Sequence, residues 1–196
     1  MTSVTRLGIE DWSKAALQVI ASEGVEQVTV EGLGRRLGVT KGSFYWHFAN
    51  REALVTAALD LWEQRATMDV IEEVGAIVDP VARLRALFTA SVGDVVDGPL
   101  DAALVATFDD GIVGTVVRRV TGRRLQFLER VFADLDFTPP EARTRARVAY
   151  STYVGHFHVT RMLEGGERDG SLDVYISNLV DVLTNGRSES ARAGAS

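Results

Sequence analysis

The most constraining feature of this sequence is that apolar residues recur at helical spacing along almost all of its 196 residues. Gly, Pro and cap-forming Ser, Thr and Asn residues interrupt the pattern where helices typically end. The alternating stretch at 25–30 is short and lies between helical patterns, so we interpret it as a loop. The sequence predicts an all-α fold of about nine helices. Eight of the expected helices span about residues 7–23, 30–37, 41–47, 51–76, 100–108, 112–135, 139–163 and 171–186. The remaining one begins at Pro80.

Composition limits the class of protein without identifying it. There is no cysteine, no apolar run long enough to span a bilayer, and no apolar signal-peptide core after the N-terminus. We therefore expect a soluble cytoplasmic chain that does not enter a membrane. The net charge of −6 argues at first against nucleic acid, but the first 51 residues carry six basic and five acidic side chains. A DNA-reading surface needs local positive charge, not a basic total.

The segment from Val28 to Phe48 has the pattern of a helix-turn-helix. Gly34 provides a small residue where two helices cross, and Gly38 suits the left-handed backbone of a turn. The expected inner face consists of Leu33, Leu37, Val39, Phe44 and Phe48. The second helix would then expose Lys41, Gly42, Ser43, Tyr45, Trp46 and His47. Such cationic, hydroxyl and aromatic groups suit phosphates and base edges in a major groove, which points to DNA binding.

This stretch resembles the TetR family of bacterial regulators over about residues 5–60, through Leu37–Ser43, Phe44–Phe48 and Asn50–Leu54. The resemblance implies that Thr40, Lys41, Gly42 and Ser43 face the groove and that Tyr45 and His47 bond phosphates. It also implies that Trp46 lies in the same strip, and that Arg51 and Thr29 meet the DNA backbone. Gly32 and Gly34 depart from the better helix formers common in the family, at about 0.5–1 kcal/mol each.

The resemblance further implies two domains. We expect a helix-turn-helix DNA-binding domain at 1–50 and a helical effector-binding and dimerisation domain at 51–186. The small, polar stretch at 187–196 is expected to be a disordered tail.

Aromatic residues spread over the second part are typical of a helical core, and the resemblance adds the possibility of an apolar cavity. The candidate ligand-binding residues are Trp62, Arg65, Met68, Phe88, Phe108, Phe127 and Tyr150. Trp62, Phe88 and Phe108 lead this set. Arg65 shares a stripe with Leu61, Trp62 and Met68, so it either meets an acidic ligand group or pairs with a neighbouring carboxylate.

The last two long helices match the place where the family forms a dimeric four-helix bundle. Ser151, Gly155 and Gly170 would permit close approach. The expected apolar seam consists of Val148, Thr152, Val159, Leu172, Ile176, Leu179 and Val180. The alternative is that these residues pack only within one chain.

These observations favour a homodimeric repressor that a small-molecule effector releases from a palindromic operator in double-stranded DNA. The alternatives are an activator or ligand-independent regulator, then a helical protein-interaction module, then an enzyme. No catalytic motif or cofactor motif is visible, so we expect no enzyme activity and no cofactor. His156 and His158 are two apart and point about 200° away from each other on a helix, which disfavours a metal site.

Overall fold

The computed structural model describes residues 7–93, 97–106, 111–163 and 172–186, and within them the fold is all-α, as predicted. The helices are α1 (Ile9–Glu23), α2 (Val30–Leu37), α3 (Lys41–Tyr45), α4 (Arg51–Glu63), α5 (Val70–Gly75), α6 (Pro80–Gly93), α7 (Asp97–Ala106), α8 (Gly111–Ala133), α9 (Pro139–Met162) and α10 (Leu172–Thr184). A 3₁₀ turn, η1 (Val25–Gln27), follows α1, and a π-helical segment, η2 (Gln64–Asp69), joins α4 to α5. Because α4, η2 and α5 are continuous, the described residues form nine separate helical rods, in agreement with the predicted number.

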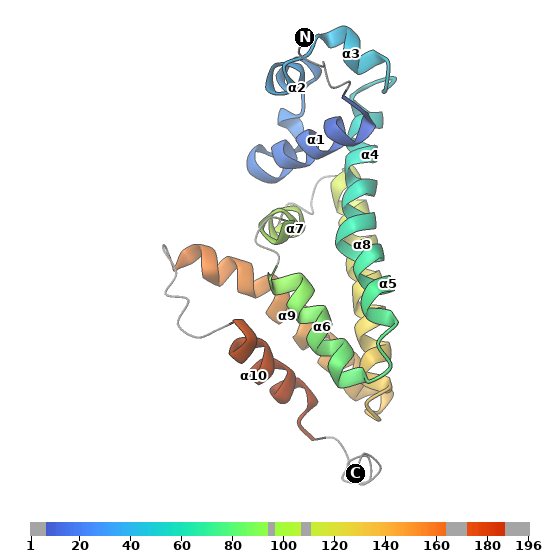
Figure 1. The fold of residues 1–196 in the computed structure, drawn as a ribbon, viewed down its shortest axis with the longest axis vertical. Coiled ribbons are helices and arrows are strands. Elements are labelled where there is room, and N and C mark those ends of the chain that lie inside the picture. The colour runs from blue at the N-terminus through green and yellow to red at the C-terminus, as the bar shows by residue number, and fades with distance from the viewer. Residues whose placement is uncertain (1–6, 94–96, 107–110, 164–171, 187–196) are drawn as a thin grey trace, which may run out of the picture.

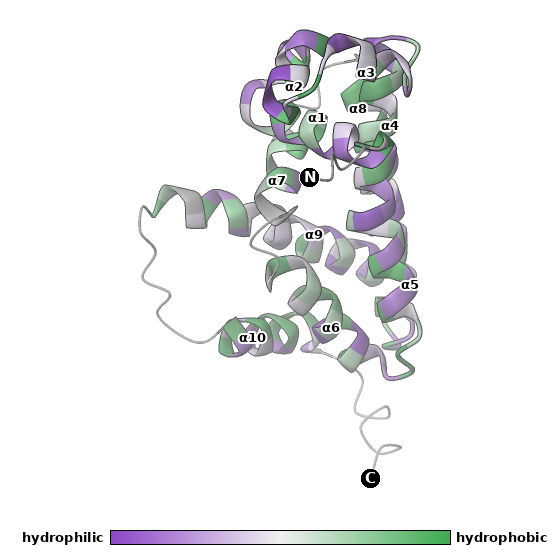
Figure 2. Cartoon of the chain, turned by 45° about the horizontal axis from the view of Figure 1, so that its top comes forward, coloured by the Kyte–Doolittle hydropathy of each residue, from purple (hydrophilic) through white to green (hydrophobic). Residues whose placement is uncertain are grey.

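The molecule is elongated, with α1, α2 and α3 at one end (Figure 1). The rod formed by α4, η2 and α5 runs from that end beside α8, while α6, α9 and α10 form the opposite end. Helix α7 lies between the two groups and packs against both α1 and α9. Figure 2 shows hydrophobic residues along α6 and α10 and hydrophilic residues along α2. None of the described helices combines the length and apolar character needed to cross a membrane.

Helices α2, α3, α4 and α9 begin where the sequence predicts them, whereas α7 begins at Asp97, earlier than the predicted start at about residue 100, and α3 ends at Tyr45 instead of about residue 47. The Thr29 hydroxyl accepts a hydrogen bond from the Gly32 backbone N–H at 3.1 Å, and the Asn50 side chain accepts one from the Ala53 N–H at 2.9 Å. Thr138 and Glu141 form a capping box at the start of α9. Thr40 precedes α3 in extended conformation but makes no side-chain cap bond. Local cap chemistry therefore sets most boundaries of the N-terminal helices.

Two hydrophobic clusters hold the described residues together. The first joins α1, α2, α3 and α4 to Leu104 of α7 and to the Val113–Val120 part of α8. The second joins α5 and α6 to the later part of α8 and to α9 and α10. The first cluster thus extends across the expected boundary at residue 50, so the N-terminal end shares its core with the rest of the molecule.

The prediction of one regular helix over 51–76 is wrong in one respect. At η2 the backbone bonds span five residues instead of four, which inserts one residue into the helical repeat. The inward face after η2 is therefore shifted by one position. Thr67 and Val74 are buried, whereas Arg65, which a regular repeat places beside Trp62, is exposed.

Candidate DNA-reading helix and effector pocket

Helix α3 is fixed by its aromatic inner face. Phe44 is completely buried, meets the Trp12 ring edge-on at 5.4 Å between centroids, and stacks on Phe48 at 5.5 Å. The predicted core role of Phe44 and Phe48 is confirmed. With Phe44 anchored inward, the helix turns Tyr45 and Trp46 to solvent, at 56% and 82% exposure.

The turn between α2 and α3 depends on two glycines. Gly38 has φ 68°, in the left-handed region that side chains other than glycine resist. A Cβ on Gly34 would lie 3.1 Å from the Val39 carbonyl oxygen, closer than ordinary van der Waals contact. The close approach predicted for Gly34 is thus made to the backbone of the turn, and the missing side chain brings α3 tight against α2.

The predicted DNA-contacting residues of α3 and its flanks gather on this end of the molecule. Thr40, Lys41, Gly42, Tyr45 and Trp46 are exposed, and Ser43 and His47 are half-buried. The Lys41 ammonium pairs with the Glu31 carboxylate of α2. This pairing raises the pKa of Lys41 and lowers that of Glu31. Helix α3 therefore presents hydroxyl and aromatic groups to solvent, together with the Lys41 ammonium, which is already paired with Glu31.

The two residues predicted to meet the DNA backbone from outside α3 have structural partners as well. Thr29 caps α2 with its hydroxyl. Arg51 is half-buried, and its Nε donates to the Val28 carbonyl at 2.8 Å while Nη2 donates to the Val25 carbonyl. Arg51 thus ties the start of α4 to the segment between α1 and α2. Contact of either residue with DNA stays a prediction.

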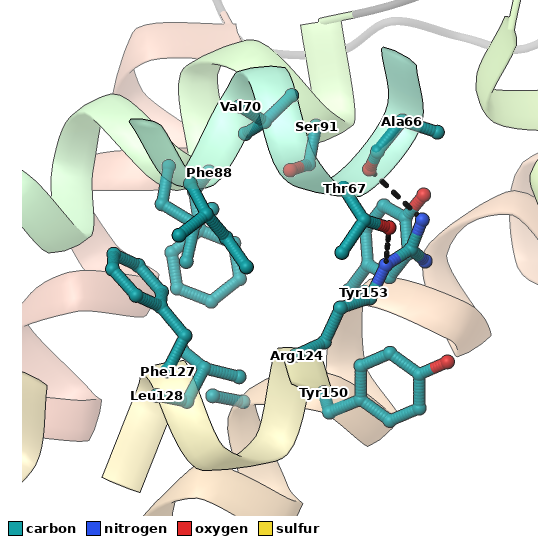
Figure 3. A pocket seen from close by; sticks show the side chains of 13 residues that line it. Ala66, Thr67, Val70, Phe88, Ser91, Arg124, Phe127, Leu128, Tyr150 and Tyr153 are labelled. Atoms are coloured by element: carbon teal, nitrogen blue, oxygen red, sulfur yellow. Dashed lines mark hydrogen bonds between the residues drawn. The ribbon is translucent and has the colours of Figure 1, made fainter. Parts of the chain in front are cut away.

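A pocket opens between η2, α5, α6, α8 and α9 (Figure 3). Its lining is mostly apolar and consists of Ala66, Thr67, Val70, Ile71, Leu87, Phe88, Ser91, Arg124, Phe127, Leu128, Ala149, Tyr150 and Tyr153. The space that admits the centre of a water molecule is about 50 Å³, which is room for a few waters. Ligand pockets are typically a few hundred Å³ or more. An organic ligand must therefore push these helices apart.

Three of the predicted ligand-binding residues, Phe88, Phe127 and Tyr150, line this pocket. Three others do not. The Trp62 indole N–H points to Asp101, Arg65 pairs with Glu10 at the surface, and the Met68 sulfur lies 3.0 Å from Arg123 Nη1. For Arg65 this is the carboxylate pairing that the sequence left open, and the shifted repeat at η2 accounts for its position. Phe108 lies outside the described residues.

One wall of the pocket is a buried polar network centred on Asp101 of α7, which is 1% exposed. Arg124 of α8 donates to its two oxygens from Nη1 and Nη2, both at 2.8 Å. The Trp62 indole N–H donates to Oδ1 at 2.9 Å, and the Tyr153 hydroxyl donates to Oδ2 at 2.7 Å. Four helices thus meet at a single carboxylate.

Arg124 is held on its other side by η2. Its Nε donates to the Thr67 hydroxyl and its Nη2 to the Ala66 carbonyl, both at 2.9 Å. Burial alone would lower the pKa of Arg124, but the Asp101 carboxylate outweighs burial and holds that pKa above its usual range. Burial, reinforced by Asp101, raises the pKa of the Tyr153 hydroxyl. The network therefore contains one fixed positive charge, one carboxylate and a phenol that stays protonated.

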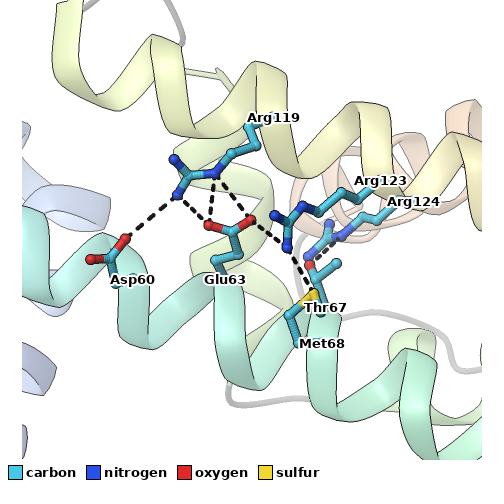
Figure 4. Close-up of polar contacts among 7 residues, drawn as sticks. All are labelled: Asp60, Glu63, Thr67, Met68, Arg119, Arg123 and Arg124. Carbon is cyan, nitrogen blue, oxygen red and sulfur yellow. Dashed lines mark hydrogen bonds and ion pairs between the residues drawn. The ribbon is translucent and has the colours of Figure 1, made fainter.

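A second ion cluster joins α4 to α8 beside the pocket (Figure 4). Glu63 is 9% exposed at its side chain and accepts hydrogen bonds from Arg119, one of them from Nε at 2.9 Å. Arg123 lies 3.4 Å from the same carboxylate, and Asp60 lies 3.5 Å from Arg119. The bond with Glu63 raises the pKa of Arg119. This cluster binds α8 to the rod that begins at the reading end.

The N-terminal part of the chain matches a known protein family. Residues 14–58, which include most of α1, all of α2 and α3, and most of α4, match the model of bacterial regulatory proteins of the tetR family. The N-terminal helices of this chain thus match the TetR family.

Curated relatives match a limited part of this chain. The transcriptional regulator SrpR of Pseudomonas putida is 33% identical over 61 residues, which are 31% of this chain and 29% of SrpR. The transcriptional regulator TtgR, also of Pseudomonas putida, is 33% identical over 84 residues, 42% of this chain and 40% of TtgR. The chain thus matches less than half the length of these relatives.

Solved structures match the fold over nearly its whole length. The fatty acid degradation regulator FadR from Bacillus halodurans has a TM-score of 0.70 at 16% identity, covering 95% of this chain and 98% of FadR. AibR in complex with isovaleryl coenzyme A and operator DNA has a TM-score of 0.63 at 18% identity, covering 90% and 97%. At these identities the likeness establishes the TetR-like fold alone.

The sequence predictions did not include Arg124 and Asp101, the ion pair of the buried network beside the pocket. Arg124 lies on the apolar stripe of α8, four residues after Val120 and three before Phe127, both of which are buried. A charged residue on a buried helical stripe requires a partner, so this position could have been singled out. Its partner Asp101 lies 23 residues earlier, on another helix, and no local pattern connects the two.

Proposed function

We propose that this TetR-family chain is a transcriptional regulator that binds double-stranded DNA through α3. The observation that carries the proposal is the anchoring of α3 by the buried Phe44, which leaves Lys41, Tyr45 and Trp46 on the free end of the molecule. A short helix held in this way fits a major groove and offers donors to phosphates and base edges. The reading domain in this proposal is residues 1–50, and residues 51–186 regulate it.

Binding to operator fragments over a range of salt concentrations tests this proposal. Lys41→Ala is expected to weaken binding and to lower the slope of log affinity against log salt by about one unit. Lys14→Ala is the matched control, because Lys14 is an exposed lysine of α1 that, like Lys41, pairs with a glutamate, Glu10. Equal effects of the two substitutions, or an absence of sequence-selective binding by the unaltered protein, would contradict the proposal.

We infer that two copies associate through α9 and α10, which places two reading helices on a palindrome. Exposed apolar side chains concentrate on these helices: Val148, Val159, Met162, Leu163, Leu172, Val174, Tyr175 and Val182. Of the predicted seam, Val148, Val159 and Leu172 are exposed, whereas Ile176 and Val180 are buried within the chain itself. Ser151 is exposed and Gly155 half-buried, and Gly170 lies outside the described residues. In Figure 1 the C-terminal half of α9 extends past α6 and α10.

Light scattering of substituted proteins tests the association. Val159→Asp places a charge on the exposed α9 surface and is expected to shift the protein to monomers, because a buried unpaired charge is costly. Val78→Asp is the control, since Val78 is 89% exposed and lies in the connection between α5 and α6. A Val159→Asp protein that keeps the mass of the unaltered protein would exclude this interface.

The regulatory part of the proposal is that an effector in the pocket releases the DNA, so that the protein acts as a repressor. The pocket wall carries Arg124, which donates hydrogen bonds to Asp101 of α7, and α7 packs against α1 of the reading domain. An effector that separates η2, α8 and α9 favours a different placement of α7 and therefore of α3. Effector and DNA then weaken each other by the same factor.

A promoter–reporter fusion separates the regulatory modes. Deletion of a repressor raises expression from its operator, whereas deletion of an activator lowers it. A ligand-independent regulator would keep its DNA affinity when the pocket is occupied. Each outcome is read against the same operator fragment, so the DNA-binding conclusion stands apart from the regulatory one.

A further inference from the structure

The charge balance of the pocket constrains what can enter it. Among the residues that line it in the described part of the chain, Arg124 is the only one with a charged side chain. Asp101, behind the wall, neutralises that charge through two hydrogen bonds of 2.8 Å. The pocket therefore has no net charge to offer a ligand.

Neither member of this pair is free to change partners. An anionic ligand that took over Arg124 would leave the Asp101 carboxylate buried and short of its main partner, which is strongly unfavourable. A cationic ligand would have to compete with Arg124 for Asp101. It would also lose the aromatic faces, because the Arg124 guanidinium carbon already lies 5.6 Å from the Trp62 ring and 5.8 Å from the Tyr153 ring.

The uncharged polar groups of the lining are few. The Tyr150 hydroxyl lies 3.1 Å from the Thr121 hydroxyl, and Thr67 accepts from Arg124. Ser91 of α6 is half-buried and lines the pocket, and its hydroxyl has no hydrogen-bond partner among the described residues (Figure 3). The surrounding surface is apolar, with Phe88, Phe127 and Leu128 on the facing helices.

We propose that the effector of this pocket is an uncharged, largely apolar small molecule with one hydrogen-bonding group that meets Ser91. This inference rests on the proposed function and names its ligand class. It differs from what the fold likeness alone would suggest, since structural neighbours are in complex with stearoyl-CoA and with isovaleryl coenzyme A. The polyanionic head of a coenzyme A ester finds no uncompensated cation among the residues that line this pocket.

A competition experiment tests the ligand class. N-phenyl-1-naphthylamine is uncharged and fluoresces in apolar sites, so it serves as the reporter. The competitors share one skeleton and differ in charge: 1-naphthalenemethanol, 1-naphthylmethylammonium and 1-naphthoate. The alcohol is expected to displace the reporter at least about tenfold more tightly than either charged compound, a difference of about 1.4 kcal/mol.

Substitutions in α6 place the binding. Ser91→Leu fills the small cavity and is expected to abolish saturable reporter binding. Thr89→Leu adds the same side chain on the exposed face of α6 and is expected to leave binding unchanged. Thermal unfolding of both variants checks that they fold.

Three results overturn the inference: no saturable reporter binding, a preference for the alcohol below tenfold or reversed, or unaltered binding in Ser91→Leu. Operator binding by the same preparation is measured separately. If it persists, only the ligand class is wrong, whereas its absence in the unaltered protein refutes the proposed function itself.

Discussion

The buried pair of Asp101 and Arg124 makes a sharp energetic prediction. Removing one member leaves the other charge buried and uncompensated, which costs about 3–5 kcal/mol. Asp101→Asn abolishes the carboxylate but keeps one oxygen, which can still accept from the Trp62 indole N–H. Its NH2 group takes the place of Oδ2, so the Tyr153 hydroxyl must accept there instead of donating. Arg124→Met keeps the length of the side chain but removes the guanidinium. Each single substitution is therefore expected to lose about 3–5 kcal/mol of unfolding free energy.

The double variant, Asp101→Asn with Arg124→Met, is expected to be far less damaged than the sum of its parts. It contains no buried charge, and its remaining loss is the two hydrogen bonds from Arg124 to Thr67 and Ala66. Those bonds contribute about 1 kcal/mol each. Because the two single losses together come to at least about 6 kcal/mol, the coupling energy between positions 101 and 124 is expected to be about 4 kcal/mol or more.

Urea unfolding followed by circular dichroism measures this coupling. With a slope of about 2–3 kcal/mol per molar urea, each single substitution lowers the midpoint by about 1–2 M. Protein concentration is held constant, because dimerisation would make stability depend on it. The exposed pair of Glu10 and Arg65 is the control and is expected to show little coupling. Additivity within about 0.5 kcal/mol at positions 101 and 124 would refute the reasoning.

Three further predictions concern the reading end and α9. Glu31→Gln frees Lys41 and is expected to tighten binding to any DNA and to steepen its salt dependence, as titration against unrelated duplexes would show. Gly34→Ala is expected to lower the melting temperature although alanine favours helices, because its Cβ would lie 3.1 Å from a backbone oxygen; an increase would contradict the packing of the turn. The capping bonds from Thr138 lower the pKa of Glu141 below 4.5. The stability that these bonds contribute is present above that pH and lost as the pH falls, so Glu141→Gln should flatten the acid side of the pH–stability curve.

The reading end could be predicted from sequence because its determinants are local. The cap bond of Thr29 spans three residues, and Gly38 acts through its own backbone angle. The burial of Phe44 and Phe48 follows from their spacing, with Phe44 in α3 and Phe48 just after it. In such a segment, the burial and backbone conformation of each residue depend on neighbours within one or two helical turns. Sequence periodicity describes contacts over this range.

The pocket could be predicted only in part, because its determinants are distant in sequence. Phe88, Phe127 and Tyr150 line the pocket. Helical spacing predicted them as core residues, and the resemblance to the TetR family added the prediction of a cavity. Trp62 is also buried, but its indole N–H donates a hydrogen bond to Asp101, 39 residues away in the sequence. Arg65 lies off the predicted stripe with Trp62 because η2 inserts an extra residue into the helix, and nothing in the local sequence marks that residue. The pairing of Arg65 with a carboxylate was one of the two predicted outcomes. Pairing across helices and irregular backbone are decided by the whole fold.

The packing of the core has a consequence for how the two ends of the molecule communicate. Leu104 of α7 and the Val113–Val120 part of α8 belong to the same hydrophobic cluster as α1 and α4. The hydrophobic core therefore continues past Phe48, where the helix-turn-helix motif ends. Closely packed interiors transmit displacement instead of absorbing it. Because Asp101 and Arg124 join α7 to α8 at the pocket, a ligand that separates their helices moves side chains already in contact with α1. The effector release proposed above then requires no flexible hinge, only the rearrangement of a continuous core.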